Sequence, residues 1–260
     1  MNIIAVIPAR MGSSRFPGKP LADIHGVPMV GHVALRTAMC ESLSATYVAT
    51  CDAVIKEYCD KAGIRCIMTA DTHDRCTTRT AEALLKIEAE TGMPADIVVM
   101  VQGDEPMTMP EMIDAAVRPM LEDASINVVN LMADMQTVEE FEDPNEVKVV
   151  VDLHNNALYF SREPVPSRRK GSPVVPMRKQ VCIIPFRRDY LLRFNALPET
   201  PLEIIESVDM MRILEHGDSV RMVPCEAGTL SVDTQHDLDR VIKLMRHDTV
   251  RLRYTPGASA

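Results

Sequence analysis

This sequence lacks the features that mark a membrane-spanning or a disulfide-bonded secreted protein. It has no apolar run approaching the ~20 residues that cross a bilayer, and no basic region precedes a long apolar stretch at its N-terminus, as in a signal peptide. Its seven cysteines are odd in number and include no C-x-x-C pair, which favours free thiols over disulfides or a zinc site. We therefore expect a cytoplasmic protein without a membrane partner.

An excess of positive charge is also absent, because the formal net charge is −9 at neutral pH. A general nucleic-acid-binding protein presents a basic surface, so we expect no nucleic-acid partner. The 260 residues are 46% hydrophobic and 25% charged, as in ordinary globular proteins, and they contain no internal repeat or long linker. We expect one domain over residues 1–250 and a loosely ordered tail over residues 251–260.

Strand-like and helix-like segments alternate through the first part of the chain. Short apolar runs predict buried strands, and the amphipathic segments between them predict helices. This alternation is typical of α/β proteins with a parallel sheet, whose ligands bind beyond the carboxyl ends of the strands. The expected strands are residues 3–8, 46–50, 65–68 and 96–101, and the expected helices are residues 29–39, 53–62 and 80–91. Farther along we expect strands at 126–131, 147–152, 157–160 and 220–223, helices at 203–216 and 235–247, and a loop at 164–176.

The loop after the first strand carries the most specific chemistry. Residues 8–21 read PARMGSSRFPGKPL, in which Gly12 and Gly18 allow tight turns while Arg10, Arg15 and Lys19 supply positive charge at neutral pH. Backbone N–H groups and serine hydroxyls in such a loop can surround an anion. The loop matches neither the P-loop nor the G-x-G-x-x-G pattern. We interpret it as a phosphate cradle for a nucleoside triphosphate; the alternative is a solvated basic loop.

Further short motifs follow in order along nearly the whole chain. They are VQGDEP at 101–106, DPNEVKVV at 143–150, ALYFSR at 157–162, PLE at 201–203 and VDT at 232–234. Together with the opening loop, they resemble the sugar-activating nucleotidyltransferases, most closely the cytidylyltransferases of the CMP-Kdo synthetase type. The resemblance implies an α/β, Rossmann-like nucleotidyltransferase fold, with a mostly parallel central sheet flanked by helices and a smaller mixed flap region. It also implies a CTP-dependent enzyme and a homodimer, as is common in that family.

Two aspartates are the candidate ligands of a catalytic Mg²⁺. Asp104 follows the strand expected at 96–101, and Asp233 lies in the turn before the last helix. Mg²⁺ prefers oxygen ligands, typically one or two carboxylates together with substrate phosphates. The resemblance points to the same two positions. The alternative for either residue is a helix cap or a solvated turn, above all for Asp233.

The loop chemistry and the resemblance together assign the nucleotide contacts. Arg10 and Lys19 are expected to hold the triphosphate and to stabilise the leaving pyrophosphate, and with Asp104 they form the predicted catalytic set. The base is expected over residues 75–79, where Thr77 and Arg79 match the family's Ser-Gly-Thr-Glu-Arg pattern but the glycine and glutamate are replaced. The predicted nucleotide-binding residues are Ala9, Arg10, Gly12, Ser13, Lys19, Thr77, Arg79 and Gln102.

The acceptor site departs from the family pattern. Where the family carries a histidine and, four residues later, a tyrosine that face the sugar, this chain has Gln180 and Ile184. The loss of these sugar-hydroxyl partners and an added guanidinium at Arg75 favour a small, highly charged acceptor. We expect a phosphonate such as phosphonoformate, in phosphonate natural-product biosynthesis. The alternatives are a CMP-Kdo synthetase, which activates Kdo or a related 3-deoxy-ulosonic acid, and a non-catalytic nucleotide-binding homologue. The predicted acceptor-binding residues are Arg75, Gln102, Arg162, Gln180 and Glu203.

Overall fold

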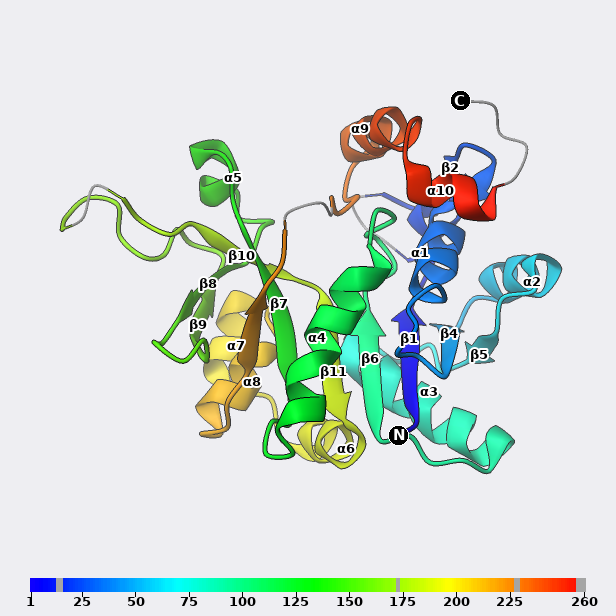
Figure 1. Ribbon diagram of the computed structural model, residues 1–260, viewed down its shortest axis with the longest axis horizontal. Coiled ribbons are helices and arrows are strands. Elements are labelled where there is room, and N and C mark those ends of the chain that lie inside the picture. The colour runs from blue at the N-terminus through cyan, green and yellow to red at the C-terminus, as the bar shows by residue number, and fades with distance from the viewer. Residues whose placement is uncertain (13–15, 172–173, 227–229, 256–260) are drawn as a thin grey trace. The chain divides into compact units, whose positions relative to one another are not determined.

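A computed structural model describes residues 1–12, 16–171, 174–226 and 230–255 of the chain (Figure 1). The chain divides into two compact units, one formed by residues 1–114 and 228–260 and the other by residues 115–227. The middle of the chain forms a unit with a sheet of its own, and one domain over residues 1–250 stays a prediction. No helix among the described residues is long and apolar enough to span a membrane.

The first unit is built on parallel strands in the order β6-β1-β4-β5 (Figure 1). Every residue of β1 is buried, which explains why its sequence is continuously apolar rather than alternating. Parallel strands end at the same edge of a sheet, so the loops after β1 and β6 emerge together. The strands are β1 (Ile3–Pro8), β4 (Ala45–Thr50), β5 (Cys66–Met68) and β6 (Ile97–Val101), and β2 (Asp23–Ile24) pairs with β3 (Val27–Pro28).

Helices alternate with these strands, as the sequence predicts. Helix α1 spans Met29–Thr37, and α2 (Ala53–Ala62) ends where expected because Gly63 takes a left-handed conformation at φ 69°. Helix α3 spans Cys76–Thr91 and begins at Cys76 rather than at residue 80. The segment expected to lie over the base therefore forms the first turn of a helix.

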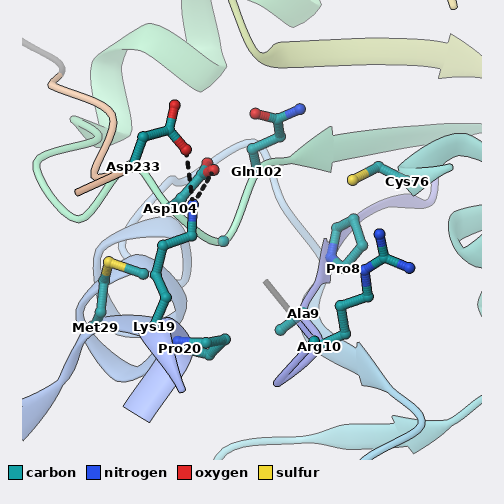
Figure 2. Close-up of a pocket in the computed structure, with 12 residues that line it drawn as sticks. Pro8, Ala9, Arg10, Lys19, Pro20, Met29, Cys76, Gln102, Asp104 and Asp233 are labelled. Carbon is teal, nitrogen blue, oxygen red and sulfur yellow. Dashed lines mark hydrogen bonds and ion pairs between the residues drawn. The ribbon is translucent and has the colours of Figure 1, made fainter. Parts of the chain in front are cut away.

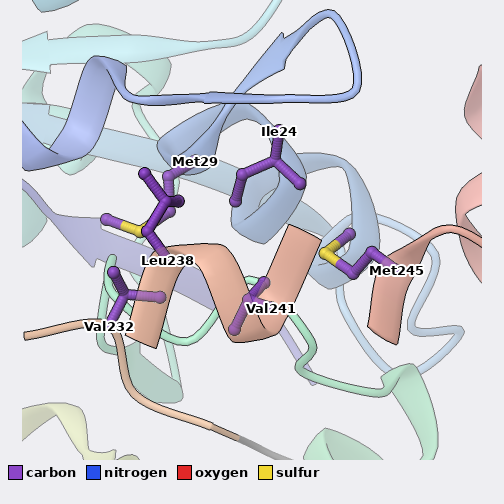
Figure 3. Close-up of a cluster of buried hydrophobic side chains, with 6 residues drawn as sticks. All are labelled: Ile24, Met29, Val232, Leu238, Val241 and Met245. Atoms are coloured by element: carbon purple, nitrogen blue, oxygen red, sulfur yellow. The ribbon is translucent and has the colours of Figure 1, made fainter. Parts of the chain in front are cut away.

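Helix α9 (Gln235–Met245) returns the end of the chain to the first unit. Thr234 caps it, because its hydroxyl accepts the N–H of Asp237 while the Asp237 carboxylate accepts the N–H of Thr234. Apolar side chains on one face of α9 pack against residues from β2 and α1 (Figure 3). The buried cluster consists of Ile24, Met29, Val232, Leu238, Val241 and Met245.

The chain continues beyond α9 as helix α10 (Thr249–Tyr254), in which Arg251 is buried. The tail predicted to begin at residue 251 is corrected accordingly, because residues 251–254 belong to a packed helix. Residues 256–260 of that tail lie outside the described residues.

The second unit holds a mixed sheet in the order β12-β7-β10-β8-β9, as expected for a flap region. Strands β12 and β7 are parallel, and the other neighbours are antiparallel. The helix predicted over 203–216 is two helices, because Ser207 adopts a left-handed conformation (φ 51°) between them. The strands are β7 (Val129–Asp134), β8 (Lys148–Val151), β9 (Ala157–Ser161), β10 (Arg178–Val181), β11 (Ile183–Arg187) and β12 (Arg221–Pro224). The helices are α5 (Val138–Glu142), α6 (Arg188–Ala196), α7 (Pro201–Glu206) and α8 (Met210–Glu215), and the division between the units falls within α4 (Pro110–Glu122).

Candidate active site

A cavity of about 270 Å³ lies at the carboxyl edge of the sheet in the first unit (Figure 2). The loop after β1, the residues after β6, the start of α3 and the turn before α9 all contribute to its wall. The lining residues are Pro8, Ala9, Arg10, Gly12, Lys19, Pro20, Met29, Cys76, Gln102, Gly103, Asp104 and Asp233. The predicted loop and both predicted aspartates therefore meet at one cavity.

Lys19 is at the centre of the charges in this cavity. Its Nζ donates to Oδ2 of Asp104 at 2.9 Å and to Oδ1 of Asp233 at 3.2 Å. Figure 2 shows the ammonium group between the two carboxylates. Burial by itself lowers the pKa of Lys19, but the charges and hydrogen bonds of the two aspartates outweigh it and raise that pKa above its ordinary value. Lys19 is therefore a fixed cation at neutral pH.

Two glycines shape the backbone around the cavity. Gly18 adopts a left-handed conformation at φ 78°, and this turn leads into the short helix η1 (Lys19–Leu21) that presents Lys19. Gly103 lets the turn after β6 approach the end of β1, because a Cβ at this position would lie 3.0 Å from the carbonyl oxygen of Pro8. A larger residue at position 103 would have to displace backbone rather than a flexible side chain.

Asp233 reaches the cavity through a backbone hydrogen bond and hydrophobic packing. The N–H of Val232 donates to the carbonyl oxygen of Asp104 at 2.9 Å. Val232 is itself fully buried in the cluster formed with α9. The two aspartates, far apart in the sequence, are thus joined both through Lys19 and through the backbone.

One carboxylate oxygen of Asp104 is buried and accepts no hydrogen bond from the described residues. Its Oδ2 accepts from Lys19, whereas its Oδ1 is inaccessible to solvent and has no hydrogen-bond partner among the described residues. A buried carboxylate oxygen without a partner is costly, and a cation beside it would satisfy it. The described residues contain no group of three or more His, Cys, Asp or Glu arranged to hold a metal. Two carboxylates completed by substrate phosphates nevertheless form a donor set that suits Mg²⁺.

Arg10 links the loop after β1 to the loop before α3. Its Nη1 donates to the carbonyl oxygen of His73 at 3.3 Å and lies 3.6 Å from Oδ1 of Asp74. The N–H of the next residue, Met11, donates to Oδ2 of Asp52 at 2.8 Å. The side chain of Arg10 remains 47% exposed, so its guanidinium is open to an anion that enters the cavity.

Some predicted nucleotide contacts do not line the cavity. Thr77 is fully buried in the first turn of α3. Arg79 is 3% exposed and donates to Oγ1 of Thr69 at 2.5 Å and to the carbonyl oxygen of Ala70 at 3.2 Å, so it holds the loop before α3. Ser13 lies outside the described residues. The predicted nucleotide contacts that do line the cavity are Ala9, Arg10, Gly12, Lys19 and Gln102.

The predicted acceptor residues divide between the two units. Gln102 lines the cavity, whereas Arg75, the residue before α3, does not. In the second unit, Arg162 donates through Nε to the carbonyl oxygen of Glu206 at 2.7 Å and through Nη1 to that of Pro144 at 2.9 Å. Arg162 thus binds backbone carbonyls, and its contact with an acceptor stays a prediction.

Gln180 and Glu203 both bond within the second unit. Nε2 of Gln180 donates to Oδ1 of Asn130 at 2.5 Å. Glu203 is fully buried, and Arg212 donates to both of its carboxylate oxygens at 2.6 Å. Glu203 also completes the capping box of α7 with Thr200. Glu203 thus forms a bidentate ion pair between α7 and α8, and its contact with an acceptor stays a prediction.

Cys76 and Met29 line the cavity although the sequence analysis does not identify them. For Cys76 a signal exists, because it occupies the position of the glycine in the family's base-binding pattern. The Cys76 side chain in place of that glycine occupies part of the cavity beside the start of α3. Met29 gives no such signal, because an apolar residue at the start of a helix is ordinarily part of the core.

Comparison with known proteins decides the family. A model of the cytidylyltransferase family matches residues 4–222. The chain belongs to the cytidylyltransferase family. It is similar to the 3-deoxy-manno-octulosonate cytidylyltransferase of Geobacter metallireducens, with 43% identity over 94% of this chain and 97% of that protein. The protein of the same name from Geobacter sulfurreducens is 41% identical over 95% of this chain and 100% of its own length.

Solved structures extend the comparison to three dimensions. A CMP:2-keto-3-deoxy-manno-octonic acid synthetase complexed with CTP matches this cytidylyltransferase with a TM-score of 0.86 and 36% identity, over 94% of this chain and 98% of its own. A cytidylyltransferase from Leptospira borgpetersenii, 16% identical with a TM-score of 0.65, shares the fold. The predicted Rossmann-like nucleotidyltransferase fold and enzyme class are confirmed. The names of the relatives agree with the sugar-acid alternative and give no support to a phosphonate acceptor.

Proposed function

We propose that this cytidylyltransferase transfers CMP from CTP to Kdo or a related 3-deoxy-ulosonic acid and releases pyrophosphate. The names of its relatives support the acceptor, and the neighbouring structure complexed with CTP supports the nucleotide. The observation that carries the proposal is the cavity in which Lys19 binds both Asp104 and Asp233 beside the loop after β1.

The reaction needs an acceptor oxygen to attack the α-phosphorus of CTP while pyrophosphate leaves. Such transfers depend mainly on positioning and on neutralising the charge of the phosphates. Lys19 is held in its charged form by two carboxylates and would stabilise the negative charge that grows on the leaving pyrophosphate. Arg10, with its exposed guanidinium, would hold the triphosphate together with the backbone around Gly12.

Asp104 and Asp233 would hold Mg²⁺, because the buried Oδ1 of Asp104 has no partner among the described residues. When bound, the ion supplies positive charge to the phosphate oxygens of the nucleotide. The two carboxylates also keep Lys19 protonated and oriented toward the same place. Lys19, Arg10 and the metal would therefore all place positive charge beside the phosphates of the nucleotide.

A phosphonate such as phosphonoformate is the second candidate acceptor. Ile184 is apolar and 2% exposed, and the amide of Gln180 already donates to Asn130. Neither residue offers the imidazole or phenol that faces the sugar in the family this chain resembles. An acceptor with fewer hydroxyls loses less from such replacements, and a phosphonate oxygen is already anionic.

Release of pyrophosphate from CTP and Mg²⁺, measured with Kdo and with phosphonoformate as separate acceptors, tests the proposal. Release with Kdo alone supports it, and release with phosphonoformate alone assigns the second candidate. Binding of CTP with no release for either acceptor indicates a non-catalytic homologue. Asp104→Asn serves as the control, because it keeps the side-chain shape and removes the charge. Equal release by this variant would refute the metal role of Asp104.

A further inference from the structure

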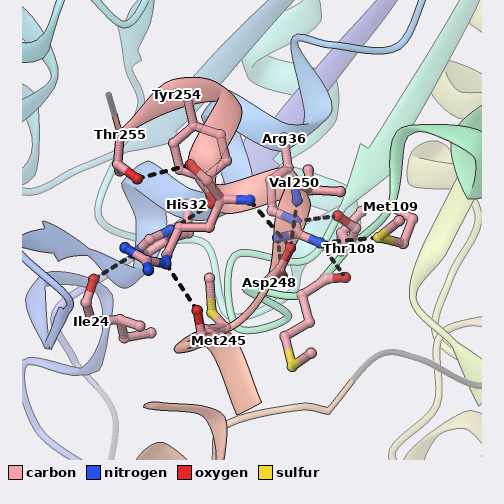
Figure 4. Close-up of polar contacts among 12 residues, drawn as sticks. Ile24, His32, Arg36, Thr108, Met109, Met245, Asp248, Val250, Tyr254 and Thr255 are labelled. Carbon is pink, nitrogen blue, oxygen red and sulfur yellow. Dashed lines mark hydrogen bonds and ion pairs between the residues drawn. The ribbon is translucent and has the colours of Figure 1, made fainter. Parts of the chain in front are cut away.

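Arg36 in α1 is a buried cation that the proposed reaction does not use, with an exposed fraction of 1%. Its Nε donates to the carbonyl oxygen of Thr108 at 2.6 Å, and its Nη2 donates to that of Met107 at 3.2 Å. Its Nη1 forms an ion pair with Oδ2 of Asp248 at 2.6 Å. Figure 4 shows the guanidinium between these groups. A single side chain thus joins the C-terminal part of the chain to the segment that follows Asp104.

Asp248 is held in place by its own contacts. Its Oδ1 accepts the N–H groups of Val250 at 2.8 Å and of Arg251 at 3.2 Å, so it caps α10. Helix α10 is attached to α1 a second time, because the hydroxyl of Tyr254 lies 2.7 Å from Nδ1 of His32 (Figure 4). The anion that faces Arg36 therefore belongs to a fixed helix end.

The segment from Asp104 to Met109 is fastened at both ends. At one end the carbonyl oxygen of Asp104 accepts from Val232 at 2.9 Å. In the middle, the N–H and the hydroxyl of Thr108 both donate to the carbonyl oxygen of Glu105, at 3.1 and 2.9 Å. At the other end Arg36 binds two consecutive carbonyls. The backbone that carries the Asp104 carboxylate therefore has its direction set from outside the cavity.

We propose that Arg36 and Asp248 form a positioning pair, which fixes the backbone of residues 104–109 and thereby aims the Asp104 carboxylate at the metal–nucleotide complex. This inference rests on the proposed metal role of Asp104. A guanidinium suits the task, because its planar fork of five donors binds two carbonyls and a carboxylate at once, whereas a lysine ammonium cannot keep this geometry. Neither residue of the pair lines the cavity, so both act through the backbone.

Two variants and a matched control test the pair. Arg36→Lys keeps the charge and removes the fork, and Asp248→Asn keeps the cap of α10 and removes the anion. The control is Arg251→Lys: Arg251 is also a buried arginine, 2% exposed, and donates to the carbonyl oxygens of Met245 and Arg246. No hydrogen bond described for Arg251 reaches residues 104–109.

The measurement is CTP binding by calorimetry over a series of MgCl₂ concentrations without any acceptor. Hydrogen exchange at the amides of Asp104, Glu105, Met107 and Thr108 and the Tm are recorded in parallel. We expect Arg36→Lys and Asp248→Asn to raise the half-saturating Mg²⁺ concentration about tenfold, as the loss of outer-sphere partners of metal ligands does, and to speed exchange in that segment. Arg251→Lys should lower the Tm without either change.

The inference is overturned if Arg36→Lys and Asp248→Asn fold and leave the Mg²⁺ dependence unchanged, or if Arg251→Lys shifts that dependence equally. Asp248→Asn decides the matter alone if Arg36→Lys does not fold. If CTP binding by the wild-type protein does not depend on Mg²⁺, the proposed metal role of Asp104 is refuted. This result is distinguishable from failure of the Arg36–Asp248 inference, because it is obtained without any variant.

Discussion

Replacement of Lys19 by methionine removes the cation that joins Asp104 and Asp233 and leaves two carboxylates facing each other. The Nζ–Oδ distances are 2.9 and 3.2 Å, and the side chains of Lys19, Asp104 and Asp233 are 12%, 25% and 22% exposed. Removal of one partner from a buried ion pair costs ~3–5 kcal/mol, and the remaining exposure places this site near the lower end. We therefore expect the free energy of unfolding without Mg²⁺ to fall by ~3 kcal/mol.

The effect of Lys19→Met on activity should be larger and should respond differently to metal. Loss of a group that stabilises developing charge costs ~10³-fold in rate, which corresponds to ~4 kcal/mol of barrier. Added Mg²⁺ would compensate the facing carboxylates and so recover part of the lost stability, but it would not replace the contact of Lys19 with the leaving pyrophosphate. Urea unfolding with and without MgCl₂, together with pyrophosphate release, measures both quantities.

Lys61→Met is the matched control for Lys19→Met. The side chain of Lys61 is 72% exposed and pairs with Glu57 on the same helix face. A solvent-exposed pair of this kind contributes little to stability, so stability and rate should stay close to the wild type. A Lys19→Met enzyme that works within threefold of the wild type would refute the role assigned to Lys19, whatever its stability.

Four further substitutions test the contacts and burial of single residues. Glu203→Gln should lower the free energy of unfolding by ~3–5 kcal/mol, because it leaves Arg212 buried without its anion. An unchanged urea midpoint with a raised KM for the acceptor would instead support the predicted acceptor contact of Glu203. Burial lowers the pKa of His32 from 6.5 to about 4, so the unfolded chain takes up the proton first and stability falls as the pH drops through this window. Between pH 7 and pH 5 the shifted pKa of His32 should lower the free energy of unfolding by ~2 kcal/mol. Urea unfolding of His32→Gln at several pH values should show a pH dependence of stability that lacks this part. Gly103→Ala should lower the free energy of unfolding by ~1–2 kcal/mol, because the new Cβ would contact the carbonyl oxygen of Pro8. Gly12→Ala should leave the free energy of unfolding unchanged, because its Cβ would meet no described atom within 4 Å, and should weaken CTP binding in calorimetry.

The first unit was predictable from sequence because its physical constraints are local. A strand buried on both faces must be apolar throughout, and β1 and β6 both are. Gly63 marks the end of α2 because a left-handed residue there satisfies the last carbonyls of the helix. Once these strands are recognised as parallel, their loops must share an edge, which brings Asp104 to the loop that contains Lys19.

The second unit was less predictable, because long-range contacts decide its details. Apolar spacing predicts one helix over 203–216, but the ion pair of Glu203 with Arg212 and the left-handed Ser207 fold this stretch into two helices. No periodicity encodes that bend. Long-range contacts also decide the role of Arg79 in the first unit, where a motif match suggests a base contact but the guanidinium donates to Thr69 and holds the loop before α3.

Asp233 marks the boundary between what the sequence dictates and what packing decides. A lone aspartate before a helix has the pattern of a cap, yet the cap of α9 is Thr234, which leaves the Asp233 carboxylate to Lys19. This assignment holds because Val232 is buried under α9 and bonded to the backbone of Asp104, which turns the next side chain toward the cavity. The position of a predicted metal ligand thus depends on apolar residues that take no part in the reaction. Substitutions in that buried cluster should lower activity by displacing the Asp233 carboxylate.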